Sequence, residues 1–195
     1  MKITKVILQS AALIAIAMPA AFAQQAAPND PMTINQRKEN QQDRIANGVQ
    51  DGQLTAGETK NLETDEAGIN KEERTMRSED DGKLTSADRT TLNNQQNKMS
   101  NQIYQDKHNA NTAHYGNNEV GQRRENQQDR IANGIRNGSL SAGQTARLEN
   151  HEQGINREVA GMRQANGGRL TGADRRAVNQ QQNRVSRQIY NKKHS

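Results

Sequence analysis

The chain has 195 residues, of which 30% are hydrophobic and 2% aromatic, and its formal net charge is +5. Together with a mean hydropathy of -1.15, this composition allows only a thin apolar core. The absence of cysteine excludes disulfide bonds, thiol catalysis and lipid attachment through a thiol. The sequence also lacks a glycine-rich phosphate loop, a serine nucleophile elbow and a helical pair of zinc-binding histidines, so we expect a non-enzymatic protein.

Residues 1–23 have the features of a secretory signal peptide. Two lysines precede an apolar run over about residues 6–17, and Ala21-Phe22-Ala23 fits the small-x-small cleavage signal. A run of ~12 apolar residues is shorter than the roughly 20 that a membrane-spanning helix needs. We therefore expect cleavage after Ala23, a flexible segment over residues 24–34, no membrane span and a periplasmic or secreted location in a bacterium.

An internal repeat covers most of the remaining chain. The decamer ENQQDRIANG occurs at residues 39–48 and again, unchanged, at residues 125–134. A shift of 86 positions aligns residues 36–108 with residues 122–194 without a gap, and about 42 of these 73 pairs are identical. The decamer is therefore the most visible part of a much longer duplication.

Apolar positions correspond almost completely between the two copies, for example Leu62 with Leu148. Because a solvated segment has no reason to keep such positions apolar, the pattern predicts two folded copies rather than a disordered chain. We place the first copy at residues 35–109 and the second copy at residues 122–195. The Asn- and Gly-rich residues 110–121 are predicted to form the linker.

Short turns inside each copy predict where helices end and begin. The turns are DGQLTAGE and DGKLTSAD in the first copy, and NGSLSAGQ and GGRLTGAD in the second. In each, a glycine can close one helix, and a Thr or Ser followed three residues later by Glu, Asp or Gln can cap the next. The first copy should then form helices at about residues 35–50, 56–80 and 86–107. The predicted fold class is all-α, with two tandem three-helix repeats joined by a short linker.

The predicted middle helix carries Leu62, Ile69 and Met76 at a spacing of seven, which places them on one stripe. Gly68 and its equivalent Gly154 interrupt that stripe, and we expect them to permit close packing or to mark a bend. The free energy gained by burying the apolar residues of each copy is small compared with the loss of conformational entropy that opposes folding. We therefore expect the two copies to pack together or the protein to oligomerise.

The four turns also resemble degenerate EF-hand calcium loops, and the whole chain resembles small secreted bacterial helical-repeat proteins with EF-hand-like turns. Alignment of the two turns of the first copy with the EF-hand loop gives the candidate calcium ligands Asp51, Glu58, Glu79, Asp81 and Asp88, and no residue is assigned a role from the resemblance to the helical-repeat proteins. The equivalent positions of the second copy carry almost no carboxylate. The capping-box interpretation explains all four turns and the calcium interpretation at most two, so weak calcium binding is the alternative function rather than the preferred one.

The two copies differ in the sign of their net charge. Residues 36–109 carry 11 basic and 14 acidic residues, net -3, whereas residues 122–195 carry 14 basic and 6 acidic residues, net +8. Most basic residues of the second copy are arginines, which suit carboxylate or phosphate partners. The candidate binding residues are Arg123, Arg124, Arg175 and Arg176.

We therefore expect a binding or scaffold protein whose second copy contacts an anionic partner. That partner is an anionic envelope polymer or an acidic protein surface, including the first copy of the same or another molecule. Nucleic acid is disfavoured because side chains that could stack on bases are nearly absent. The alternative interpretation of the charge is a solvated surface without a ligand.

Overall fold

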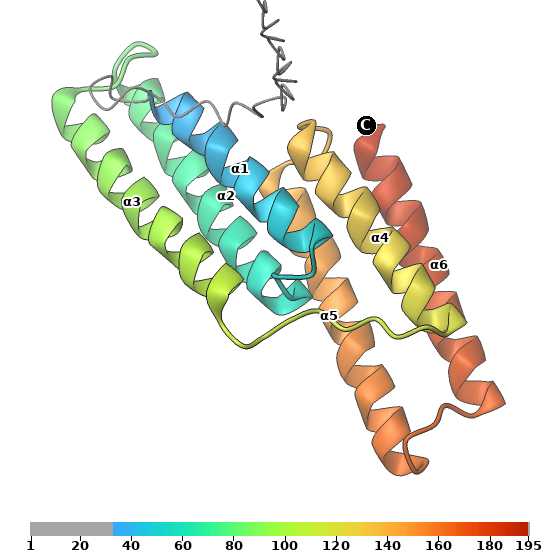
Figure 1. Cartoon of the computed structure of the whole chain (residues 1–195). Helices are drawn as coiled ribbons and strands as arrows, with labels where there is room; N and C mark the ends of the chain where they lie inside the picture. The colour runs from blue at the N-terminus through green and yellow to red at the C-terminus, as the bar shows by residue number, and fades with distance from the viewer. Residues whose placement is uncertain (1–32, 195) are drawn as a thin grey trace, which may run out of the picture. The chain divides into compact units, whose positions relative to one another are not determined.

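The computed structural model describes residues 33–194, which contain six α-helices and no β-strand. The predicted signal peptide and most of the segment 24–34 lie outside the described residues. The all-α prediction is confirmed for the described part, and no helix there is long and apolar enough to cross a membrane. Figure 1 labels the helices, which are α1 (Ile34–Gln50), α2 (Ala56–Glu79), α3 (Ser86–His108), α4 (Glu119–Arg136), α5 (Ala142–Ala165) and α6 (Gly172–Lys193).

The observed helix ends differ from the prediction by one residue in the first copy and by three at the start of the second. Helix α1 begins at Ile34 with Thr33 as its N-cap, so these two residues belong to the helix and not to a flexible segment. Helix α4 begins at Glu119 with Asn118 as its N-cap, because the Asn118 side chain accepts a hydrogen bond from the Gly121 backbone. The last residues of the predicted linker therefore form the first turn of α4.

Reciprocal capping boxes begin all four helices that follow the predicted turns. At α2, the Thr55 side chain accepts a hydrogen bond from the Glu58 backbone, and the Glu58 carboxylate accepts one from the Thr55 backbone at 2.9 Å. Gly52 and Gly138 have positive φ angles of 67° and 70°, a conformation that glycine adopts without strain. The predicted chemistry of these turns is confirmed.

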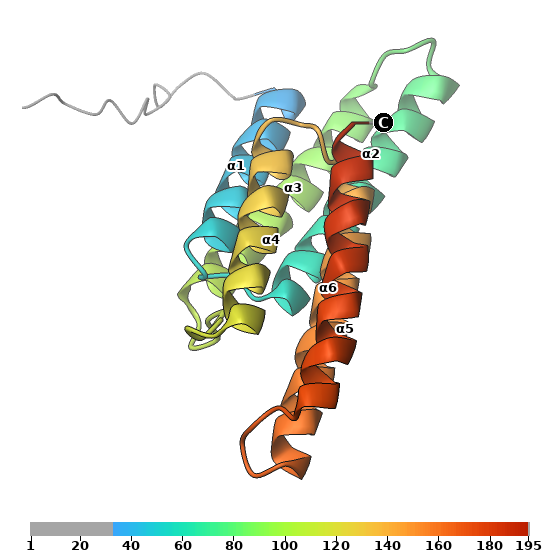
Figure 2. The same ribbon diagram turned by 90° about the vertical axis from the view of Figure 1, so that its right-hand side faces the viewer.

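The two copies pack against each other mainly through α2 on α5, with α1 on α4 beside them. Gly57 in the first turn of α2 faces Gln153 in the middle of α5, and Gly143 at the start of α5 faces Ala67 in α2, so these helices run antiparallel. Helix α3 packs only on α1 and α2, and α6 only on α4 and α5, within residues 33–194. Figure 1 shows α3 and α6 at the two outer sides of this arrangement, and Figure 2 shows α6 from its outer side. The expected packing of the copies is confirmed.

The apolar core is thin, as the composition predicts, and glutamines extend it. The Gln41 amide donates to the Gln96 carbonyl at 2.7 Å and to the Ser100 hydroxyl at 2.9 Å, and the Gln96 amide donates to the Ile34 carbonyl. Gln127 and its partners repeat these bonds between α4 and α6. The repeated decamer thus joins the first and third helices of each copy, and its glutamine at position 41 does not bridge the copies.

Gly68 and Gly154 do not permit close packing, which is one of the two roles that we expected for them. Both glycines are exposed, and a Cβ built at either position would meet no atom within 4 Å. Helix α2 continues through Gly68 without a break. The two turns of the first copy therefore lie at opposite ends of one long helix, which excludes the short contact between paired loops that EF-hands form.

Candidate functional site

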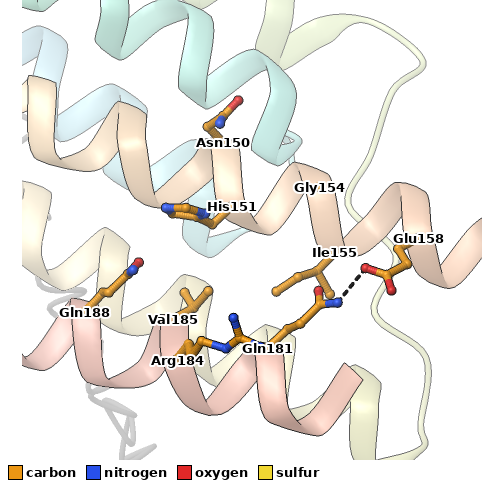
Figure 3. A pocket seen from close by; sticks show the side chains of 9 residues that line it. All are labelled: Asn150, His151, Gly154, Ile155, Glu158, Gln181, Arg184, Val185 and Gln188. Atoms are coloured by element: carbon orange, nitrogen blue, oxygen red, sulfur yellow. Dashed lines mark hydrogen bonds between the residues drawn. The ribbon is translucent and has the colours of Figure 1, made fainter. Parts of the chain in front are cut away.

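A groove runs between the second and third helices of each copy, beside the exposed glycine. These two grooves are named the α5–α6 groove, which has a volume of about 480 Å³, and the α2–α3 groove, which has a volume of about 410 Å³. Figure 3 shows the residues that line the α5–α6 groove, which are Asn150, His151, Gly154, Ile155, Glu158, Gln181, Arg184, Val185 and Gln188. The α2–α3 groove is lined by the residues 86 positions earlier, which are Thr64, Asp65, Gly68, Ile69, Glu72, Gln95, Lys98, Met99 and Gln102.

The groove exists because glycine leaves the middle of the second helix without a side chain. Ile155 and Val185 form its apolar floor, and each is only 4% exposed. On its rim, the Gln181 amide donates to the Glu158 carboxylate at 2.6 Å, as Figure 3 shows. The same bond, at the same distance, joins the equivalent pair in the first copy. This rim contact joins the two helices on one side of the groove in each copy.

The two grooves differ in the charge that they offer. In the α5–α6 groove, His151 projects from α5 and Arg184 from α6 (Figure 3). The equivalent positions of the α2–α3 groove are Asp65 and Lys98. Replacement of a carboxylate by an imidazole, and of an ammonium by a planar guanidinium, makes the second groove the better acceptor of an anion.

The four predicted arginines do not form one site. Arg175 and Arg176 are exposed in the first turn of α6, where Arg175 also donates to the Leu170 carbonyl at 2.9 Å. Arg123, on α4, donates to the Asn183 side chain of α6. Arg124 lies over the Tyr115 ring, 5.3 Å from the ring centroid, and burial lowers the pKa of its guanidinium. The anion-binding candidates are therefore those on α6.

Ion pairs distinguish the copies further. Both side-chain ion pairs among residues 33–194 belong to the first copy and share Glu73, which contacts Lys38 at 2.9 Å and Arg77 at 2.8 Å. Val159 stands at the position equivalent to Glu73, so the second copy lacks the carboxylate that neutralises this region in the first. Arg184 and Arg187, which are not among the residues predicted from the sequence, are exposed on α6 together with the predicted Arg175 and Arg176.

The predicted calcium ligands are divided between the two ends of α2. Glu58 serves the capping box of α2, and Asp88 serves that of α3. Asp51, Glu79 and Asp81 are exposed in the turns or at the helix end. Within residues 33–194, no three His, Asp or Glu side chains form a group that could hold a metal ion.

Four buried glutamates lie on the faces of α2 and α5 where the copies pack, and sequence analysis missed them. Glu63, Glu66, Glu149 and Glu152 are each at most 1% exposed. Burial raises the pKa of Glu63 to about 8 and that of Glu152 to about 7. The sequence carries a signal for one glutamate of each pair, because Glu66 and Glu152 lie on the helix stripe that also carries the buried leucine and isoleucine, whereas Glu63 and Glu149 lie beside that stripe.

Only a few polar groups face these carboxyls. The Gln42 amide donates to Glu63 at 3.4 Å, and the Gln128 amide donates to Glu149 at 3.1 Å. The charge of Arg124 opposes the effect of burial on the pKa of Glu152. Because desolvation outweighs these partners, the interface between the copies favours protonated glutamates.

The chain matches no protein-family model, no similar protein was found among curated proteins, and no similar fold was found among solved structures. The candidate function therefore depends on the grooves and on the distribution of charge described above.

Proposed function

We propose that this chain is a secreted or periplasmic, non-enzymatic binding protein built from two tandem three-helix repeats. Its second repeat binds an anionic partner along α6 and the adjoining α5–α6 groove. The observation that carries this proposal is the set of exposed arginines on α6, none of which has an ion-pair partner among residues 33–194. This set consists of Arg175, Arg176, Arg184 and Arg187.

Three of the four arginines share a helix face that adjoins the groove, whereas Arg175 lies on another side of α6. Arg176 and Arg184 are eight residues apart, and Arg187 follows three residues later, so their side chains lie along one side of α6. His151 lies on the α5 side of the groove, across from Arg184. A row of guanidinium groups beside this groove suits an extended polymer that carries carboxylate or phosphate groups. Each planar guanidinium can donate two parallel hydrogen bonds to two oxygens of such a group.

The position of α6 supports an intermolecular partner. Within residues 33–194, α6 packs only on α4 and α5, so no helix of the acidic first copy contacts it. An acidic surface of another molecule, including the first copy of a second chain, or an anionic envelope polymer would have access to the arginines.

Binding of inorganic polyphosphate to the protein tests this proposal. Removal of two exposed charges in the double variant Arg184→Gln/Arg187→Gln should weaken binding about tenfold, since each pairing contributes up to ~1 kcal/mol. The matched control is Lys98→Gln on α3, the equivalent of the change at position 184, and we expect less than a ~2-fold effect from it. Equal losses in both variants, or affinity that does not fall at high salt, would overturn the proposal.

A further inference from the structure

The linker lies in a groove between the two copies, which we call the linker groove. The groove is lined by the start of α2, by α4 and by α5, and the space left beside the linker is about 120 Å³. Its lining includes Thr55, Ala56, Arg124, Gln128, Glu152 and Asn156, together with the linker residues Thr112 to Tyr115. The chain thus fills this groove with a piece of its own extended backbone.

Specific contacts hold the linker there. The Ala113 backbone N–H donates to the Gly52 carbonyl at 2.9 Å. Asn109 and Asn111 both donate through their side-chain amides to Glu58, at 2.7 Å and 3.1 Å. Tyr115 packs under Arg124, and burial raises the pKa of its phenol. Backbone pairing and one aromatic side chain on a cation are therefore the main features of this contact.

A second groove has the same construction, because the duplication generates each wall twice. We call it the open groove. Its volume is about 510 Å³, and its lining includes Lys38, Gln42, Glu66, Asn70, Ser141 and Ala142. These six residues are the equivalents of Arg124, Gln128, Glu152, Asn156, Thr55 and Ala56. No segment among residues 33–194 covers the open groove as the linker covers its counterpart.

Equivalent residues of the linker groove and the open groove differ in their neighbours and in their exposure. A Cβ at Gly52 would lie 3.3 Å from the Ala113 carbonyl oxygen, whereas a Cβ at Gly138 would meet nothing within 4 Å. Gly52 and Thr55 are half-buried, whereas Gly138 and Ser141 are exposed. The linker accounts for these differences, because it lies on one set of residues and not on the other.

We propose that the open groove is a docking site for an extended peptide segment of a partner protein, with a backbone N–H on the Gly138 carbonyl and an aromatic side chain beside Lys38. This site is separate from the arginines of α6. The linker of a second copy is not the occupant, because Gly52 and Glu58 already hold each linker in its own groove. The lining carries both signs of charge, with Glu39 and Asp43 balanced by Lys38 and Arg136, so the occupant is defined by its extended backbone and its aromatic side chain rather than by net charge.

The probe is a synthetic peptide with the linker sequence in which tryptophan replaces tyrosine, NTAHWGNN. The protein contains no tryptophan, so the emission of the peptide reports its environment alone. We expect a saturable blue shift when the protein is added. Emission that stays unshifted throughout the titration would overturn the proposal.

The variant Gly138→Asn locates the binding. A side chain at this position projects to where the linker would lie, as the geometry at Gly52 shows, and asparagine tolerates positive φ. The matched control is Gly168→Asn, at another turn with a positive φ and no neighbour within 4 Å. We expect Gly138→Asn to weaken peptide binding about tenfold and Gly168→Asn to leave it unchanged, with unchanged helicity by circular dichroism in both.

Two further results would point to a different binding site or to a different occupant. Equal binding by both variants would place it outside the open groove. Binding that appears only after removal of residues 24–32 would make the chain's own N-terminal segment the occupant. Either result overturns the proposal, and neither affects polyphosphate binding by α6.

Discussion

Replacement of Glu63 by glutamine should stabilise the fold at neutral and alkaline pH. Glu63 is fully buried, and its Oε1 atom has no hydrogen-bond partner. Glutamine has the same shape and retains an oxygen that can accept the hydrogen bond from Gln42. The substitution therefore removes the titration of this side chain and preserves its packing.

The magnitude follows from the pKa of Glu63. In the unfolded chain the carboxyl loses its proton near pH 4.5, whereas burial raises the pKa in the folded state to about 8. Since the folded pKa is the higher one, the stability that this group contributes is fully present below about pH 4.5 and is lost as the pH rises to about 8. At pH 7 the loss is about 3 kcal/mol, at roughly 1.4 kcal/mol for each pH unit.

Urea unfolding of the protein and of Glu63→Gln between pH 4.5 and pH 8 measures this effect. We expect the stability of the variant relative to the protein to increase with pH, by about 3 kcal/mol between pH 4.5 and pH 7. Glu125→Gln, which changes an exposed carboxylate of α4, should stay within ~0.5 kcal/mol of the protein throughout. A constant difference between Glu63→Gln and the protein across this range would refute the assignment of a protonated Glu63.

Two further predictions concern glycine and glutamine positions. Gly68→Ala should raise stability by about 1 kcal/mol, because its site is exposed, helical and open. Gly134→Ala should lower stability, because the new Cβ would lie 2.5 Å from Leu140 Cδ1. Melting temperatures that shift in the same direction in both variants would contradict this. Gln41→Ala should cost about 1 to 3 kcal/mol, because it removes a buried side chain and its hydrogen bonds to the Gln96 carbonyl and the Ser100 hydroxyl. Urea unfolding within ~0.5 kcal/mol of the protein would count against that role.

The helices were predictable because their ends depend on local chemistry. A Thr at position 55 with a Glu three residues later forms a capping box wherever a helix follows, so the sequence shows the boundary directly. The exposure of Gly68 could not be predicted in the same way. Its exposure depends on the distance between α2 and α3, which the stripe of apolar residues does not specify.

Of the candidate site, only the sign of its charge could be predicted from the sequence. Counting charges identified the second copy as basic, but tertiary contacts divide the four arginines chosen from the sequence, and Arg124 lies over the Tyr115 ring. The linker was recognised by its Asn and Gly content, yet its place in a groove depends on contacts with Gly52 and Glu58. Those residues precede it by more than fifty positions, so no local pattern reveals the contact.

Amide chemical-shift mapping with polyphosphate tests the proposed function most directly, because the two copies serve as each other's control. We expect the largest shifts along α6 and at His151 of α5, and small shifts along α3, which is the equivalent helix of the first copy. Shifts of equal size on α3 and α6, or shifts confined to other helices, would contradict anion binding by the second copy.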